Sequence, residues 1–198
     1  MAFPTLFILG TAIMSCNPQV MCTISEPVDL PIFQPGYLDP VDSQTHLKVG
    51  QKAPDFTLPS LSGKEVRLSE LIKDKAVVIT FVPAAWTPVC SEQWPGYNVA
   101  EPFFEEADAI LIGITVDNLP TLHAWTEEMG GVWFEVLSDF YPHGKVSAQF
   151  GILRSEGTSE RALFIIDQEG IIQYIDVHDI NKRPPLDELI HALDALKM

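Results

Sequence analysis

The sequence predicts an α/β fold in which a central mixed sheet is flanked by helices on both faces. Residues 76–82 and 109–116 are nearly continuous runs of apolar and β-branched side chains, the pattern of strands buried on both faces. Residues 88–106 lie between these runs and are long enough for a crossover helix, so the two strands should be parallel. An amphipathic stripe over residues 184–197 predicts a helix at the end of the chain.

Two short alternating runs precede the first buried strand. Residues 55–58 and 65–68 flank the turn signal Ser62-Gly63, so we expect a small β-hairpin there. Residues 69–72 should follow it as a short capped helix.

Prolines and glycines divide the middle of the chain. Pro95 and Pro102 should bend or break the crossover helix. Residues 119–129 have a helical pattern that Gly130-Gly131 should end.

A second hairpin is predicted near the end of the chain. Residues 162–166 and 171–175 are apolar runs that flank the turn sequence of residues 167–170. A βαβ unit followed by a hairpin and a helix is the order of elements in the thioredoxin-like fold, which we expect for residues 47–198.

Residues 1–46 are expected to form a separate part, an apolar segment followed by an extended arm. The first basic residue is Lys48, and the four acidic residues before it give this part a charge of −4, leaving −11 of the total −15 for the rest. Proline removes ladder donors, which favours an extended arm over a strand. The arm contains Pro27, Pro31, Pro35 and Pro40.

The apolar run of residues 3–14 leaves three interpretations open. It is shorter than the about 20 residues that span a bilayer, but it has the length of a signal-peptide core, and the residues ending in Cys16 loosely resemble a lipoprotein cleavage box. The positive segment that usually precedes such a core is missing. We expect a cytoplasmic protein whose arm packs on its own domain or on another; export, lipid anchoring through Cys16 and a misassigned start are the alternatives.

The composition excludes several classes of function. The chain has 12 Lys and Arg against 27 Asp and Glu, a net charge of −15, which disfavours nucleic acid and anionic lipid as partners. Its cysteines, Cys16, Cys22 and Cys90, include no CxxC pair, so neither a disulfide scaffold nor a zinc site is predicted. The five histidines show no ligand spacing.

Cys90 follows the first buried strand at the start of the crossover helix. The carboxyl end of a central strand is the usual functional edge of an open α/β sheet, and the free N–H groups of a helix N-terminus stabilise a thiolate, the nucleophilic form of cysteine. Thr87 precedes Cys90 by three residues and should share its helical face. Arg161 stands just before a strand next to the centre of the sheet, where its guanidinium could stabilise the thiolate and an incoming oxygen.

Three motifs in the same order and spacing resemble the peroxiredoxins, the alkyl hydroperoxide reductase and thiol-specific antioxidant family. The signature P-x-x-x-T-x-x-C is present as Pro83, Thr87 and Cys90. Residues 49–58 resemble the usual opening of that family, and Arg161 with the strand after it matches the family's second-site arginine.

The resemblance implies a peroxidase that needs no metal or cofactor. Cys90 would be the peroxidatic cysteine, whose thiolate attacks a hydroperoxide and becomes a sulfenic acid. Thr87 and Arg161 would hold the peroxide, Pro83 would shield the sulfenate, and Trp86 and Val89 would line the pocket. The family resemblance also suggests a homodimer.

One departure from the family concerns the resolving cysteine. No cysteine follows Cys90, so the chain resembles a one-cysteine member reduced by an external thiol or thioredoxin-like protein, unless Cys22 or Cys16 resolves the sulfenate. A thiol–disulfide oxidoreductase and a non-catalytic redox-sensing or binding module are the alternatives. The former would need a second sulfur where Thr87 stands.

Overall fold

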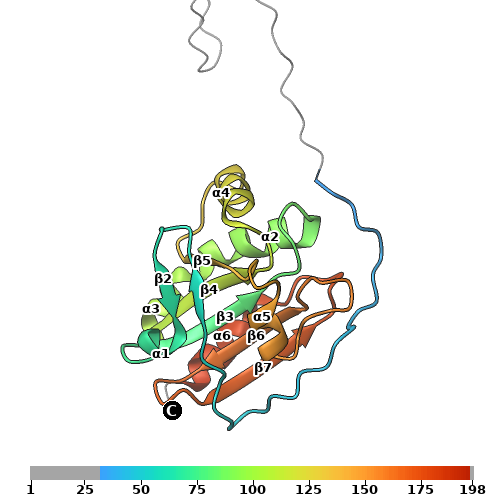
Figure 1. Ribbon diagram of the computed structural model, residues 1–198. Helices are drawn as coiled ribbons and strands as arrows, with labels where there is room; N and C mark the ends of the chain where they lie inside the picture. The colour runs from blue at the N-terminus through green and yellow to red at the C-terminus, as the bar shows by residue number, and fades with distance from the viewer. Residues whose placement is uncertain (1–31, 197–198) are drawn as a thin grey trace, which may run out of the picture. The chain divides into compact units, whose positions relative to one another are not determined.

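Five strands form the central sheet, in the order β5-β4-β3-β6-β7 (Figure 1). In this computed structural model, which describes residues 32–196, β3, β4 and β5 run parallel, whereas β6 is antiparallel to β3 and β7. The mixed sheet and the thioredoxin-like order are therefore confirmed. The strands are β3 (Ala76–Phe81), β4 (Ala109–Thr115), β5 (Glu135–Ser138), β6 (Arg161–Ile166) and β7 (Ile172–His178).

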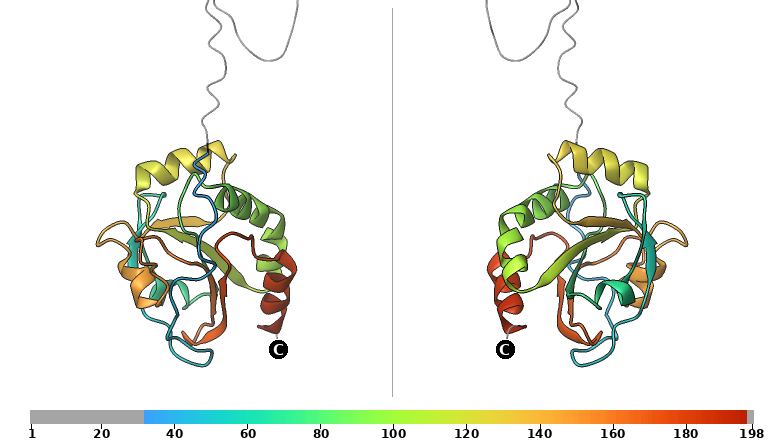
Figure 2. Two further views of the ribbon diagram at one scale, coloured as in Figure 1. Left: turned by 90° about the vertical axis from the view of Figure 1, so that its right-hand side faces the viewer. Right: turned by 90° about the vertical axis from the view of Figure 1, so that its left-hand side faces the viewer.

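Two hydrophobic cores cover the two faces of the sheet. Successive residues of a strand point to opposite faces, so Val78 belongs to one core, and Val77 and Ile79 belong to the other. This explains why the central strands read as continuous apolar runs. Figure 2 shows α2 and α6 together on one face and α5 on the other.

The helices occupy both faces, as expected. The first face carries α2 (Pro88–Tyr97), the 3₁₀ turn Asn98–Ala100, α3 (Glu101–Glu106), α4 (Leu119–Glu128) and α6 (Leu186–Ala195). The second face carries the predicted hairpin of β1 (Thr57–Pro59) and β2 (Glu65–Arg67), together with α1 (Leu68–Leu71) and α5 (Lys145–Gln149).

The crossover is interrupted as expected, although not at Pro95, and two other local details differ from the sequence analysis. The crossover helix continues through Pro95 and breaks only at the 3₁₀ turn, after which Pro102 stands at the start of α3, where a missing N–H costs little. Ser69 is not an N-cap: α1 begins at Leu68, and the Ser69 hydroxyl donates to Asp55 instead (3.0 Å). The short elements β5 and α5 were not predicted, because neither presents a long periodic pattern.

Residues 32–43 lie along the domain in an extended conformation, and we call them the strap (Figure 1, blue). They belong to the predicted arm, whose earlier part, with Cys16 and Cys22, lies outside the described residues. Across residues 32–196, no helix is long and apolar enough to cross a membrane.

Candidate active site at the start of helix α2

Cys90 lies in the first turn of α2, at the carboxyl end of β3. The helix begins at Pro88, and Thr87 is its N-cap residue. The first N–H groups of a helix have no partner within it and carry partial positive charge, which favours a thiolate in the first turn. The Cys90 side chain is fully buried and is the only free cysteine among the described residues.

Two side chains hold the loop that leads from β3 into α2. The Ala85 N–H donates to Asp117 Oδ2 (2.8 Å), just after β4, and the Ser159 hydroxyl donates to the Val82 carbonyl (3.0 Å). Both partners come from neighbours of β3 in the sheet, so the sheet itself fixes the start of α2.

The turn immediately before α2 has an unusual backbone. Trp86 has a φ of 61°, in the left-handed region that costs energy for a residue with a side chain. The Trp86 carbonyl accepts a hydrogen bond from the Phe33 N–H of the strap (3.0 Å). The Thr87 hydroxyl donates to the Ala84 carbonyl (2.9 Å), which leaves the lone pairs of Thr87 Oγ1 free to accept a hydrogen bond from a ligand.

Arg161 reaches the Cys90 sulfur from β6. Its Nη2 lies 3.6 Å from Cys90 Sγ, and only 2% of its surface is exposed. The Ile180 carbonyl accepts from Nε (3.3 Å) and Nη2 (3.0 Å), and Gln93 Oε1 accepts from Nη1. The guanidinium is therefore fixed in one orientation by two neutral acceptors, and its charge remains available to a thiolate and an incoming oxygen.

Gln93 is a site residue that the sequence analysis missed. It lies one turn after Cys90 on α2, and its amide donates to Tyr97 Oη (2.8 Å) and Thr80 Oγ1 (3.3 Å). Burial raises the pKa of the Tyr97 phenol. The three-residue spacing from Cys90 places Gln93 on the same helix face, but only the packing of β6 against β3 shows that its partner is Arg161.

A cavity of about 710 Å³ opens beside this group of residues. Most of its lining is apolar and includes Thr87, Val89 and Arg161, whereas the buried Cys90 itself is not part of the lining. The other residues that line it are Pro83, Ala84, Ala85 and Pro88 before and in α2, Phe33, Gln34, Pro35, Gly36, Tyr37 and Leu38 of the strap, and Glu156, Thr158, Ile180 and Asn181.

The turn after β7 joins the strap to Arg161. The Asn181 side chain donates to the Leu38 carbonyl (2.8 Å) and accepts from its N–H (3.0 Å), and the Ile180 N–H donates to Pro40 (2.9 Å). Asp179 stabilises this turn by accepting from the Asn181 N–H (3.0 Å) and from Lys182 (3.0 Å), and these contacts lower its pKa to about 2.

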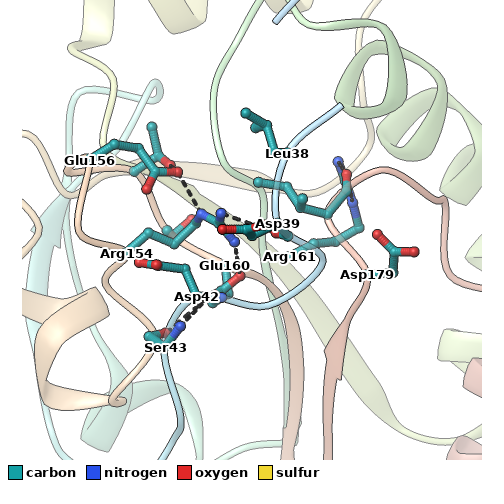
Figure 3. Close-up of polar contacts among 12 residues, drawn as sticks. Leu38, Asp39, Asp42, Ser43, Arg154, Glu156, Glu160, Arg161 and Asp179 are labelled. Carbon is teal, nitrogen blue, oxygen red and sulfur yellow. Dashed lines mark hydrogen bonds and ion pairs between the residues drawn. The ribbon is translucent and has the colours of Figure 1, made fainter. Parts of the chain in front are cut away.

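A buried ion pair holds the far end of the strap (Figure 3). Glu160 Oε1 accepts from the N–H groups of Asp42 (2.7 Å) and Ser43 (2.6 Å), while its Oε2 accepts from Arg154 Nη1 (2.7 Å). Arg154 also donates to the Asp39 carbonyl (3.2 Å). Glu160 and Arg154 are buried, so this contact is shielded from water.

The structure brings most of the predicted site residues together. Pro83, Thr87, Val89 and Arg161 all line the cavity, whereas Trp86 does not and packs against the core of the α2 face instead. The predictions for Cys16 and Cys22 lie outside the described residues. Within residues 32–196, no group of three or more His, Cys, Asp or Glu side chains could hold a metal ion.

Comparison with known proteins gives a consistent assignment. Residues 49–175 match the AhpC/TSA family. The chain is 32% identical over 160 residues to a chloroplastic 2-cysteine peroxiredoxin of Chattonella marina var. antiqua, which covers 76% of this chain and 81% of that protein. It is 35% identical over 132 residues to alkyl hydroperoxide reductase E of Mycobacterium tuberculosis. This match covers 66% of this chain and 86% of that protein.

Solved structures agree with the sequence comparison. The reduced 2-Cys peroxiredoxin of Plasmodium vivax superposes with a TM-score of 0.69 at 29% identity, over 75% of this chain and 81% of that one. Peroxidoxin BcpB of Mycobacterium tuberculosis superposes with a TM-score of 0.67 at 30% identity. The match covers 76% of this chain and 98% of that one. With Cys90 buried against Arg161, these matches show that the chain belongs to the AhpC/TSA family of peroxiredoxins and is a thiol peroxidase.

Proposed function

We propose that Cys90 is the peroxidatic cysteine and that Thr87 and Arg161 hold the peroxide against it. The observation that carries this proposal is the 3.6 Å contact between Arg161 Nη2 and Cys90 Sγ, beside a cavity that Thr87 also lines. A thiolate is the reactive form of cysteine, and a fixed guanidinium together with helix N–H groups favours negative charge at this position.

In the first step, the Cys90 thiolate attacks the terminal oxygen of the hydroperoxide. A sulfur–oxygen bond forms as the oxygen–oxygen bond breaks, so the sulfur is oxidised by two electrons to a sulfenic acid. The leaving oxygen takes up one proton from solvent, which balances the proton that the thiol released on ionisation, and departs as water or an alcohol. Thr87 Oγ1 accepts from the peroxide O–H, because its own proton is already donated to Ala84. Arg161 stabilises the charge that develops on the two oxygens.

Pro83 has a protective role in this proposal. Its ring is buried and lines the cavity next to α2, where it limits the access of water and of further peroxide to the sulfenic acid. Gln93 acts as a positioning residue, since it contacts Arg161 rather than the sulfur.

We further propose that the chain works as a one-cysteine enzyme. No cysteine follows Cys90 in the sequence, so a thiol reductant from outside the domain reduces the sulfenic acid. The resolving role of Cys22 or Cys16, the homodimer and the cytoplasmic location stay predictions. Mass spectrometry of peroxide-treated protein tests the first of these, because a disulfide from Cys90 to Cys22 or Cys16 would make the chain a two-cysteine enzyme.

A stopped-flow measurement tests the catalytic proposal. The reduced full-length protein should consume one equivalent of peroxide in a fast phase, and Cys90→Ser should abolish that phase. Cys22→Ser is the matched control and should leave it intact, because Cys22 is not required for the first step. A wild-type rate no faster than that of free cysteine would contradict the proposal.

A further inference from the structure

Three buried polar side chains extend from Arg161 into the core between the sheet and α2, and we call them the polar cluster. Thr80 belongs to β3, a strand that is otherwise apolar, and it points to the α2 face as Val78 does. Gln93 and Tyr97 lie one turn apart on α2. All three side chains are buried. Polar groups in a core are unfavourable unless they are hydrogen-bonded, so the contacts of the polar cluster are a specific feature of this core.

The polar cluster meets Arg161 through the amide of Gln93, whose two ends differ chemically. Gln93 Oε1 accepts from Arg161 Nη1, whereas Nε2 donates to Tyr97 Oη (2.8 Å) and to Thr80 Oγ1 (3.3 Å). A guanidinium can only donate, so it binds the oxygen end of an amide and not the nitrogen end. The two ends have nearly the same shape, and a reversed amide would fit the same space while setting donors against donors.

The orientation of this amide decides how firmly Arg161 is held at the sulfur. The acceptors of its N–H groups are Gln93, the Ile180 carbonyl and Cys90 Sγ. Among the described residues, no carboxylate forms an ion pair with Arg161. With the Gln93 amide reversed, the guanidinium would keep one neutral anchor, Ile180, and could turn away from Cys90.

Tyr97 is fixed in the place where it can hold the amide. Its ring packs against Phe134 with ring centroids 6.5 Å apart, and its backbone carbonyl accepts from Trp133 Nε1 (3.1 Å). Burial raises the pKa of the Tyr97 phenol, and the charged groups that face it are Arg161 on β6 and Asp176 on β7. The phenol therefore keeps its proton at neutral pH and acts as a neutral hydrogen-bonding group.

We propose that Tyr97, assisted by Thr80, is a positioning residue of the peroxidase reaction that holds the Gln93 amide with its oxygen toward Arg161. The proposal rests on the proposed function of Cys90 and deepens it. Tyr97 does not line the cavity, so it acts through Gln93 and not on the peroxide. Without its hydroxyl, the guanidinium is held less firmly, and both the thiolate and the charge on the peroxide oxygens are stabilised less.

Tyr97→Phe tests the proposal, because it removes the hydroxyl and keeps the ring. The second-order rate constant of the reduced full-length protein with hydrogen peroxide should fall about fivefold, the factor that one neutral hydrogen bond typically contributes. The pH profile of this constant should move to higher pH, because the thiolate is stabilised less. Thr80→Val removes the more distant acceptor and should cause a smaller loss, of about twofold.

Tyr174→Phe is the matched control. Tyr174 packs against the same core, and its hydroxyl is not a partner of Gln93. Its rate constant and pH profile should equal those of the wild type.

A second background tests the orientation of the amide itself. A carboxylate has two equivalent oxygens, so Gln93→Glu presents an oxygen to Arg161 whichever way the group is turned. In Gln93→Glu protein, Tyr97→Phe should therefore lower the rate constant by less than about twofold. Equal losses in the two backgrounds would show that Tyr97 does not act by orienting the amide, and would overturn the proposal.

The pH profile separates positioning from a merely structural role. An unchanged rate constant in Tyr97→Phe, or a loss of rate without a shift of the profile, would also overturn the proposal and would leave the peroxidase assignment intact. A wild-type protein that does not react with hydrogen peroxide would instead contradict the proposed role of Cys90.

Discussion

At the scale of single residues, the orientation of Arg161 is the main feature of the site. Four of its N–H groups are directed at once to the Ile180 carbonyl, to Gln93 and to the Cys90 sulfur. A planar guanidinium holds its N–H groups in a fixed arrangement that can serve these acceptors together. A positive charge without this geometry is therefore insufficient to make the same contacts.

Arg161→Lys should therefore slow the reaction with peroxide severely, although the positive charge remains. We expect a loss of about 10²-fold or more in the second-order rate constant, the range seen when a fixed donor to a developing negative charge is removed. Stopped-flow kinetics on the reduced protein measures it. Arg183→Lys, at an exposed position after β7, is the control. An unchanged rate in Arg161→Lys would show that Arg161 does not contact the reacting atoms.

Asp179 gives the site a defined dependence of stability on pH. Its pKa in the folded protein is about 2, below the ordinary value of 3.8, because the Asn181 N–H and Lys182 stabilise the carboxylate. The contribution of the carboxylate is present above about pH 4 and is lost as the pH falls toward 2.

The difference in the free energy of unfolding between wild type and Asp179→Asn should follow this window. It should be largest at neutral pH and shrink below pH 4, as measured by urea denaturation at a series of pH values. Asp74→Asn removes an exposed carboxylate elsewhere and is the control for the general change of charge. If the difference in the free energy of unfolding instead grew as the pH fell, the stabilising role of the Asp179 carboxylate would be contradicted.

At the scale of elements, the strap depends on one buried carboxylate. Glu160 is fully buried and accepts from two strap N–H groups and from Arg154, which links the strap to the segment between α5 and β6. Removal of Glu160 leaves these donors without their acceptor inside the protein. A buried charge that loses its partner is expensive.

Glu160→Ala should lower the free energy of unfolding by about 3 kcal/mol. It should also increase the rate of proteolytic cleavage within residues 32–43. Glu156→Ala is the matched control: its carboxylate binds the same Arg154 at 2.5 Å but is 43% exposed, so its loss should cost less than about 1 kcal/mol. Equal decreases in the free energy of unfolding of the two variants would show that the burial of Glu160 does not determine its contribution to stability.

At the scale of the whole molecule, helix α2 carries the site by packing closely on the sheet. Gly113 on β4 permits this approach, because a Cβ there would lie 2.6 Å from Trp94 Cζ2 and 3.0 Å from Phe134 Cε2. Trp94 in turn packs against Trp125, with ring centroids 4.8 Å apart and the rings tilted by 40°. The position of α2 over the sheet therefore depends on the absence of a side chain at Gly113.

Gly113→Ala should destabilise the protein by about 1–3 kcal/mol through overpacking. Gly96→Ala is the control within α2: its Cβ would make an ordinary 3.5 Å contact with Arg183, so the change should be neutral or stabilising by up to about 1 kcal/mol. Thermal and urea denaturation measure both variants. A neutral Gly113→Ala would show that Trp94 can move without cost.

Prediction from sequence succeeded where a local pattern was strong. The buried strands, the two hairpins, α4 and α6 each have a periodicity or turn sequence of their own, and all were confirmed. The short β5 and α5 were missed because four or five residues carry too little pattern, and their formation depends on neighbours in the sheet and core.

The features of the site can be divided in the same way, into those that the sequence predicted and those that only the structure revealed. By itself the sequence determined the α/β class, the position of Cys90 at the start of α2 and the pairing of a threonine with it, because each of these follows from residues close together in the chain. Only the tertiary structure decided that Gln93 orients Arg161, that Glu160 and Asn181 fix the strap, and that the strap lines the same cavity as Thr87 and Arg161. The physical reason is that these contacts join residues 68 to 143 positions apart, and a hydrogen bond over such a separation leaves no periodic trace in the sequence.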